Sequence, residues 1–200
     1  MLMEEPQVGT RERLLELSAQ LFRERGFHAT SMRDIARAAH MQPASIYHHF
    51  PGKGSILHEL MRGFLMELLH SAANASDQAA DATGRLAAFM RTHIRLHATR
   101  AMVALVTDSE LRALKDPARR EVVMLRDRYE QLLQDILRQG VQEGLMHVPD
   151  VKIASYQLLA LGTGVVFWWR PDGRLSLEEI VEQHVGAAFG ICGVGRGKRG

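Results

Sequence analysis

The chain has a single cysteine, Cys192, among its 200 residues, so it cannot form an internal disulfide bond. Its fold must therefore depend on an apolar core, and a reducing compartment is expected. The apolar run Leu158–Trp169 is too short to cross a bilayer, and the first residues lack the basic and apolar pattern of a secretion signal. We therefore predict a cytoplasmic protein with no membrane partner.

Signatures of catalysis are also missing. The sequence contains no H-E-x-x-H, G-x-S-x-G or P-loop motif, so we expect no enzyme and no cofactor. Strand-like alternation and internal repeats are absent as well. What remains is a chain that is 46% hydrophobic and 24% charged, which is ordinary for a globular protein. Because apolar residues recur at helical spacing, the fold is predicted to be all-α.

Helix start and stop signals divide the chain into segments. Ser31 with Asp34, and Ser176 with Glu179, are predicted capping boxes, and Pro43 suits a first helical position. A polar, alanine-rich loop is expected over residues 74–83. The predicted helices span residues 10–25, 31–39, 43–50, 54–73, 85–100, 101–114 in one or two pieces, 117–144, 150–168 and 176–190.

These helices predict two domains between two mobile ends. Residues 1–9 are an expected N-terminal arm, and residues 193–200 an expected basic tail. Residues 10–53 are predicted to form a three-helix helix-turn-helix domain, and residues 54–192 a larger helical domain for ligand binding and dimerisation. The smaller core is predicted to contain Leu17, Leu21, Phe22, Ile35, Ala38, Ile46 and Phe50.

The second short helix of the helix-turn-helix is the candidate for reading DNA in the major groove. Gln42, Pro43, Ala44 and Ser45 can meet base edges or thymine methyl groups, and His48 shares their exposed side. Five other side chains suit phosphate contacts, namely Ser31, Arg33, Tyr47, His49 and Lys53. An alternative is that Tyr47, His48 and His49 only end a surface helix.

The run TSMRDIARAA from Thr30, followed by SIYHHF from Ser45 and by Lys53, resembles the N-terminal domain of the TetR family of transcriptional regulators. The resemblance implies phosphate contacts at Tyr47, His49 and Lys53, and base reading over residues 42–45. His40 stands where this family usually has glycine, which a left-handed turn residue can tolerate. Gly54 stands where an acidic residue usually begins the next helix, which weakens the start of that helix.

A homodimer is indicated by the apolar helix at 150–168, which a monomer would struggle to cover. The resemblance places the interface on the last two helices, and a two-fold dimer implies a palindromic operator on double-stranded DNA. The alternative is that this helix is the central core helix of a monomer. The candidate interface residues are Ala154, Leu158, Leu161, Gly162, Val165, Val166, Ile180 and His184.

The resemblance also implies a small-molecule pocket among the middle helices. Segments near Met102, Arg126 and Phe167 are similar to a branch associated with fatty-acid and steroid catabolism, whose effectors are acyl-CoA thioesters. Arg100, Arg126 or Arg128 would then meet phosphates, although these arginines with Asp108 and Glu110 can equally form a salt-bridge network. The candidate pocket residues are Phe64, Leu68, Phe89, His93, Leu96, His97, Met102, Val106, Arg126, Tyr129 and Trp168.

His93 and His97 lie four residues apart, which also suits metal ligands with Asp108 or Glu110, but without a cysteine cluster no metal site is predicted. The function that these patterns favour is a ligand-responsive repressor, released from its operator when a hydrophobic or acyl-CoA effector binds. Ligand would shift the helix over residues 54–73 and change the spacing of the recognition helices. The alternative is a helical carrier of hydrophobic ligands that does not bind DNA.

Overall fold

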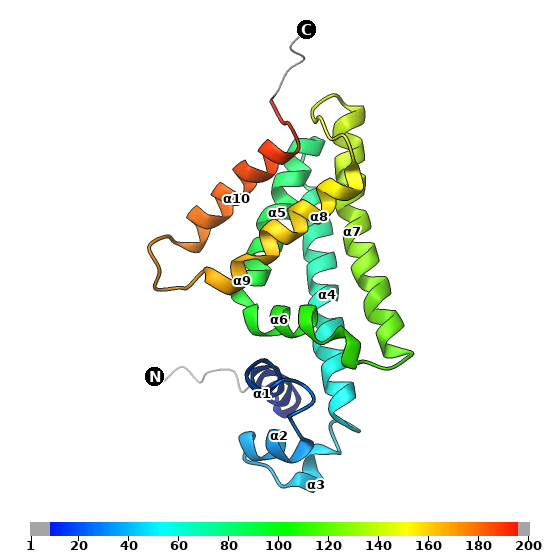
Figure 1. The fold of residues 1–200 in the computed structure, drawn as a ribbon, viewed down its shortest axis with the longest axis vertical. Helices are drawn as coiled ribbons and strands as arrows, with labels where there is room; N and C mark the ends of the chain where they lie inside the picture. Colours follow the sequence, from blue (N-terminus) through cyan, green and yellow to red (C-terminus); the bar gives the residue numbers. More distant parts are fainter. Residues whose placement is uncertain (1–8, 196–200) are drawn as a thin grey trace, which may run out of the picture. The chain divides into compact units, whose positions relative to one another are not determined.

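All regular secondary structure in the part of the chain that the computed structural model describes, residues 9–195, is helical, which confirms the all-α prediction (Figure 1). In chain order the helices are α1 (Thr10–Arg25), α2 (Met32–Ala38), α3 (Pro43–Ile46), α4 (Lys53–Asp77), α5 (Ala82–Thr99), α6 (Ala101–Ser109), η1 (Leu111–Ala113), α7 (Ala118–Gln142), α8 (Val151–Thr163), α9 (Val165–Trp168) and α10 (Leu177–Ile191).

The chain divides into two compact units that do not follow its order. Unit 1 contains the described residues up to Phe64 together with Met102–Val122, and unit 2 contains Leu65–Ala101 and the residues from Val123 onward. The predicted domains, 10–53 and 54–192, were contiguous. The difference arises because α4 and α7 each have 25 residues and, at a rise of about 1.5 Å per residue, are too long for one small domain.

Unit 1 contains the helix-turn-helix, in which α2 packs against both α1 and α3. Its interior is closed by Leu14, Ile35 and Ile46, each with no exposed surface, and by Phe22 and Phe50 at 1%. Leu17 and Ala38, both predicted in this core, are only half-buried. Leu14 and Ala36 are fully buried in the interior instead, beside the predicted Leu21, Phe22 and Ile35.

The predicted local signals of unit 1 are confirmed. The Ser31 hydroxyl accepts from the Asp34 N–H, and an Asp34 carboxylate oxygen accepts from the Ser31 N–H at 3.0 Å. Pro43 is the first residue of α3. His40, in the turn between α2 and α3, has a φ of 55°, the left-handed conformation that glycine adopts more easily.

Several predicted helix ends are wrong. α4 continues through the predicted loop to Asp77, because alanine-rich sequence favours helix and because Ala72 and Ser76 are fully buried. α5 therefore begins earlier, at Ala82, where the Asp81 carboxylate accepts from the Gly84 N–H. α3 ends at Ile46 and continues as turns to His49. The predicted helix at 150–168 is broken into α8 and α9 at Gly164.

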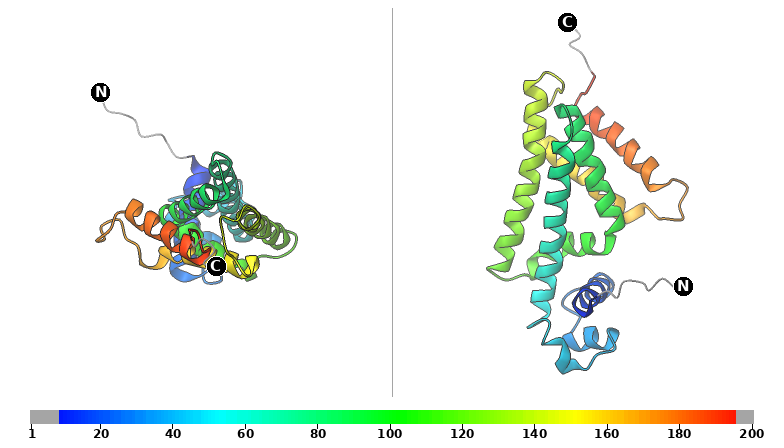
Figure 2. Two further views of the ribbon diagram at one scale, coloured as in Figure 1. Left: turned by 90° about the horizontal axis from the view of Figure 1, so that it is seen from above. Right: turned by 180° about the vertical axis from the view of Figure 1, so that it is seen from behind.

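Unit 2 is arranged around α5, which packs against α8, α9 and α10, as two opposite views of the ribbon also show (Figures 1 and 2). At the surface, ion pairs join α5 to α10, between Arg91 and Glu182 and between Arg95 and Glu178. Residues 193–195, predicted to be mobile, form a turn in which the Val194 N–H donates to the Phe189 carbonyl. The rest of the predicted arm and tail, 1–8 and 196–200, lies outside the described residues.

Gly162 of α8 is required for the close approach of α5. A Cβ added at this glycine would overlap the His93 ring, with His93 Nε2 at 2.9 Å and Ile94 Cγ1 at 3.3 Å. Gly162 was predicted to let a second copy approach, but the structure shows that it makes room for a side chain of the same chain. The neighbours are ring and aliphatic atoms of buried residues, so they cannot move aside easily.

We predict that Gly162→Ala lowers the free energy of unfolding by about 1–3 kcal/mol, because overpacking exceeds the gain in helix propensity. The matched control is Gly63→Ala in α4, where an added Cβ meets nothing within 4 Å. There we expect stabilisation by about 1 kcal/mol. Urea unfolding of the two variants checks this, and similar changes of the same sign would contradict it.

Candidate nucleic-acid interface

The segment from Gln42 to Phe50 separates buried anchors from exposed polar groups. Ile46 and Phe50 point into the core, with at most 1% of their surface exposed. Gln42, Pro43, Ala44 and His48 are exposed, Tyr47 is 55% exposed, and Ser45 and His49 are half-buried. The structure therefore places every residue predicted on this segment at the surface of unit 1. One face of about two helical turns is left free for a partner.

The first turn of α2 contributes Ser31 and the exposed Arg33. The Ser31 hydroxyl donates to the Asp34 carboxylate at 2.5 Å, and this hydrogen bond is the main reason why the pKa of Asp34 is lowered. The Ser31 hydroxyl proton is thus directed within its own helix. A phosphate can only accept a hydrogen bond, so a lone pair of the Ser31 oxygen cannot bind it. A phosphate contact at Ser31 would therefore require the hydroxyl to rotate away from Asp34.

Lys53, predicted as a phosphate contact, is directed at backbone. Its ammonium donates to the carbonyl oxygens of Phe27 at 2.8 Å, His28 at 3.1 Å and Thr30 at 2.9 Å. The same nitrogen lies 4.5 Å from the centre of the Phe27 ring. All of these partners of Lys53 lie in the loop between α1 and α2. The sequence did not indicate that Lys53 would bind this loop.

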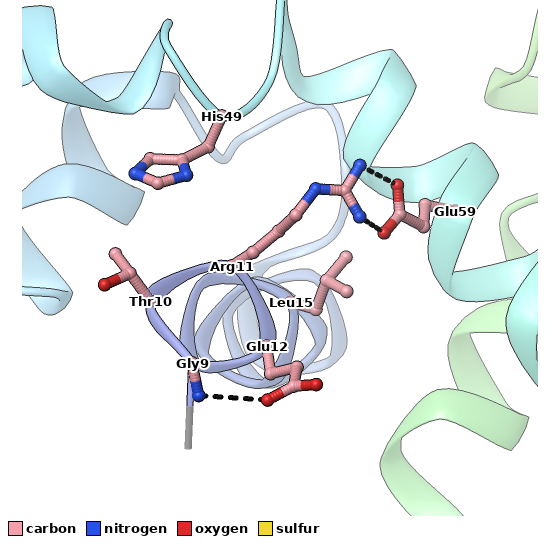
Figure 3. A pocket seen from close by; sticks show the side chains of 7 residues that line it. All are labelled: Gly9, Thr10, Arg11, Glu12, Leu15, His49 and Glu59. Atoms are coloured by element: carbon pink, nitrogen blue, oxygen red, sulfur yellow. Dashed lines mark hydrogen bonds and ion pairs between the residues drawn. The ribbon is translucent and has the colours of Figure 1, made fainter. Parts of the chain in front are cut away.

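An open pocket of about 640 Å³ lies at the start of α1 and includes His49 (Figure 3). Its main feature is the two-point ion pair between the Arg11 guanidinium of α1 and the Glu59 carboxylate of α4. The Arg11 guanidinium carbon also lies 4.7 Å from the centre of the Phe50 ring. No residue of the predicted effector pocket lines it. The lining residues are Gly9, Thr10, Arg11, Glu12, Leu15, His49 and Glu59.

The predicted effector-pocket residues are divided between the two units. Phe64, Met102 and Val106 belong to unit 1, and the others to unit 2. Met102 is 42% exposed and Trp168 52% exposed, so neither side chain is enclosed. Trp168 stacks on His184 of α10 with ring centres 5.8 Å apart. Leu68, Phe89, His93, His97 and Tyr129 are buried, while Leu96 and Arg126 are half-buried.

Inside unit 2, the two histidines belong to a hydrogen-bonded cluster that joins α5, α7 and α8. The partners fix the proton positions, because a carbonyl can only accept. His93 Nε2 donates to the Leu159 carbonyl at 3.2 Å, so His93 Nδ1 accepts from the Tyr129 hydroxyl at 3.0 Å. His97 Nδ1 donates to the His93 carbonyl at 2.8 Å, so His97 Nε2 accepts from the Thr163 hydroxyl at 3.4 Å.

Burial keeps both rings of this cluster neutral. Desolvation lowers the pKa of His93 well below its ordinary value, and the nearby His97 adds to this effect. Desolvation also lowers the pKa of His97 to about 4. Phe89 and Tyr129 stack with ring centres 5.0 Å apart on the same cluster. The alternative use of His93 and His97 as metal ligands would require breaking these bonds, and among the described residues no group of three or more His, Cys, Asp or Glu side chains could hold a metal ion.

The predicted interface residues on α8, α9 and α10 face largely inward. Ala154, Leu158, Gly162, Val165 and Ile180 are buried within unit 2, so they are not available to a second copy. Leu161, Val166 and His184 are half-buried. The stretch at 150–168 has apolar residues on all sides, so only the tertiary structure decides which side is buried. The exposed residues on these helices are Lys152, Ile153, Tyr156, Gln157, Ala160, Phe167 and Trp168, with Glu178, Glu179, Glu182, Gln183, Gly186, Ala187, Gly190 and Ile191 of α10.

Sequence reasoning missed Arg11 and Glu59 and considered Glu110 only as a salt-bridge or metal partner, although all three side chains hold unit 1 together. Arg11 and Glu59 lie 48 residues apart, and Glu110 lies 83 residues from Phe27, whose N–H it accepts at 3.2 Å. No local pattern joins residues at such separations. Their only signal in the sequence is the charge of single residues on or beside a helix, which is common on any surface.

A buried three-helix core that presents a short helix with polar residues outward defines a helix-turn-helix DNA-binding protein. Comparison with known proteins gives the family. The description "Bacterial regulatory proteins, tetR family" matches residues 14–60, and "Tetracyclin repressor-like, C-terminal domain" matches residues 79–192. The chain belongs to the TetR family of transcriptional regulators. Family membership also agrees with the expectation that it is not an enzyme.

Individual relatives match over nearly the whole chain. The HTH-type transcriptional repressor KstR2 of Mycobacterium tuberculosis is 33% identical over 90% of this chain and 91% of its own. The structure of the ketosteroid transcriptional regulator KstR2 of the same organism matches with a TM-score of 0.85 and 29% identity, covering 94% of this chain and 96% of that one. AibR in complex with isovaleryl coenzyme A and operator DNA matches with a TM-score of 0.80 and 28% identity, covering 90% and 97%.

We predict that stability falls on mild acidification because of the histidine cluster. The pKa of His97 is lowered from 6.5 to about 4 in the folded chain. The contribution of the neutral His97 ring to the free energy of unfolding is therefore complete above pH 6.5 and is lost as the pH falls toward 4. In that range the unfolded chain binds a proton that the folded chain does not. The expected slope is about 1.4 kcal/mol per pH unit for each such histidine.

Urea unfolding between pH 7 and pH 5 measures this slope. The interval avoids the carboxylates whose pKa is lowered from 4.5, such as Glu121 and Glu178, because these lose their contribution at lower pH. His97→Gln keeps an acceptor and a donor but removes the titration, so its slope should be smaller by about 1.4 kcal/mol per pH unit. An unchanged slope in this variant would exclude His97 as the cause.

Proposed function

We propose that the protein is a cytoplasmic repressor that binds a palindromic operator as a homodimer and is released by an acyl-CoA or similar hydrophobic effector. The observation that carries the DNA-binding part is the outward face of residues 42–48, held by buried Ile46 and Phe50. Gln42, Pro43, Ala44 and Ser45 would meet base edges, with His48 beside them. Arg33, Tyr47 and His49 would contact phosphates, as would Ser31 after rotation of its hydroxyl.

The effector class is supported by the relatives. KstR2 is described as a ketosteroid regulator, and AibR was solved with isovaleryl coenzyme A. In this chain the proposed acyl site lies in unit 2, around Leu68, Phe89, Leu96 and the neutral histidine cluster. Arg126 is half-buried on α7 and would face the polar end of the ligand. Phe89 and Tyr129 pack directly on each other, so an acyl chain would have to separate them.

That separation suggests how ligand and DNA binding are coupled. Helices α4 and α7 both continue from one unit into the other. Side chains of unit 2 that move apart for a ligand would displace the later turns of α4, and a continuous helix transmits a displacement along its axis. In a dimer, this would change the distance between the two copies of α3, which must match successive major grooves to bind one palindrome.

The exposed apolar surface of α8, α9 and α10 supports the homodimer. Ile153 is 52% exposed, Tyr156 47%, and Phe167 69%. Gly186 and Gly190 of α10 have open space around them, which would permit close helix contact with a second copy. The stretch Val151–Trp168 is also long and apolar enough to cross a membrane, and only 28% of it is buried. Because Gly164 divides it into two helices, a protein partner is the better explanation.

We predict that the purified protein retards the DNA flanking its own gene in a gel shift, and that a series of acyl-CoA thioesters releases it while free coenzyme A does not. The acyl chain must enter the apolar site to shift the equilibrium toward the released state. Ser45→Ala should change the preferred operator sequence, because its hydroxyl would face the base edges. An acyl-CoA that raises the melting temperature of a chain with no DNA affinity would support a carrier instead.

We predict that Gly186→Glu dissociates the dimer without unfolding the monomer. The added side chain enters open space in one copy but would block helix contact between copies, and a glycine in mid-helix is replaced by a better helix former. Sedimentation and circular dichroism measure the two effects. Gly63→Glu, also in open space but on α4, is the matched control and should remain dimeric. A dimeric Gly186→Glu variant would remove α10 from the interface.

A further inference from the structure

The loop of residues 26–30 between α1 and α2 is held by a lysine whose hydrogen bonds are all used. Lys53 Nζ donates to the carbonyls of Phe27, His28 and Thr30 at 2.8, 3.1 and 2.9 Å. An ammonium group has three N–H donors, so three carbonyl partners use all of them. The Phe27 ring, 4.5 Å from Nζ, covers a further side of the cation.

A carboxylate holds the same loop through its N–H. Glu110, which follows α6, accepts from the Phe27 N–H at 3.2 Å. Within the loop, the Thr30 hydroxyl donates to the Gly26 carbonyl at 2.9 Å, and Gly26 has a φ of 81°. Three carbonyls of the loop are therefore hydrogen-bonded to one cation, Lys53, and one N–H of the loop to one anion, Glu110, and both side chains come from distant parts of the sequence.

This loop determines how α2 leaves α1. Ser31, the N-cap of α2, directly follows Thr30, and Lys53 is the first residue of α4. The ends of three helices thus meet at one ammonium group. Apolar contacts hold α2 and α3 on the core, but they are not directional, whereas these hydrogen bonds fix an angle.

We propose that Lys53 and Glu110 are positioning residues that orient the α2–α3 pair for DNA, and that Lys53 is not a phosphate ligand. This inference rests on the proposed DNA binding and replaces the role that the resemblance gave to Lys53. Moving the ammonium to a phosphate would leave three carbonyls without their donor, and the Phe27 and Thr30 bonds are partly buried. The unsatisfied carbonyls would oppose the gain from the phosphate.

The dependence of operator affinity on salt separates the two roles of Lys53. Each lost phosphate contact lowers the slope of log affinity against log salt by about 0.9. For Lys53→Met we expect operator affinity to fall about tenfold with the slope unchanged. For Lys53→Arg we expect a similar loss, because a planar guanidinium cannot place three donors where one nitrogen stood. Arg33→Ala, at an exposed cation of α2, is the control in which the slope should fall.

Substitution of Glu110 gives a second test, in which charge and geometry predict changes of opposite sign in the affinity for DNA. Removing a carboxylate from a DNA-binding unit should by charge alone strengthen DNA binding. If Glu110 positions the loop, Glu110→Ala should weaken binding about tenfold instead. Glu110→Gln keeps an oxygen that can accept from the Phe27 N–H, so it should restore most of the affinity.

All affinities are measured well below the melting temperature, with the folded fraction checked by circular dichroism. A lower slope in Lys53→Met that Lys53→Arg restores would show that Lys53 contacts a phosphate and would overturn the proposal. A lower melting temperature with unchanged affinity would show a purely structural role and would also overturn it. If Lys53→Met does not fold, the Glu110 pair decides alone, and tighter binding by Glu110→Ala refutes the inference. Failure of the wild-type chain to bind DNA would instead refute the proposed function.

Discussion

The ammonium of Lys53 satisfies three carbonyl oxygens of the loop between α1 and α2, and the geometry of unit 1 depends on this interaction. Carbonyls beyond the end of a helix have no partner within it, so whatever satisfies them decides the path of the chain. Here the partner is the first residue of α4, and Glu110 holds the loop through Phe27. The exposed face at residues 42–48 is presented by a helix pair whose direction these bonds set.

Unit 2 is held together by hydrogen bonds between neutral side chains in its interior. His93, His97, Tyr129 and Thr163 form a hydrogen-bonded cluster that joins α5, α7 and α8. Such directional bonds in a buried site oppose alternative packings more strongly than apolar contacts do. The ion pairs of Arg91 and Arg95 with α10 are partly exposed, so each adds little to stability.

The two units share α4 and α7, because each of these helices has residues in both. In the proposed repressor, the effector would act on the cluster of unit 2 and the operator on unit 1. The exposed apolar side of α8 and α10 would be covered by the second copy. The chain belongs to the TetR family, and the residues proposed for each role are chosen from their placement in this fold.

The sequence by itself determined the features that depend on neighbouring residues. The capping box of Ser31 and the proline that opens α3 were predictable, because each depends on a few adjacent positions, whereas the left-handed turn at His40 was expected only from the family resemblance. Only the tertiary structure decided that α4 continues to Asp77, that Gly162 makes room for His93, and that Lys53 faces backbone. These depend on packing and hydrogen bonds between residues far apart in the chain, which helical spacing and composition do not encode.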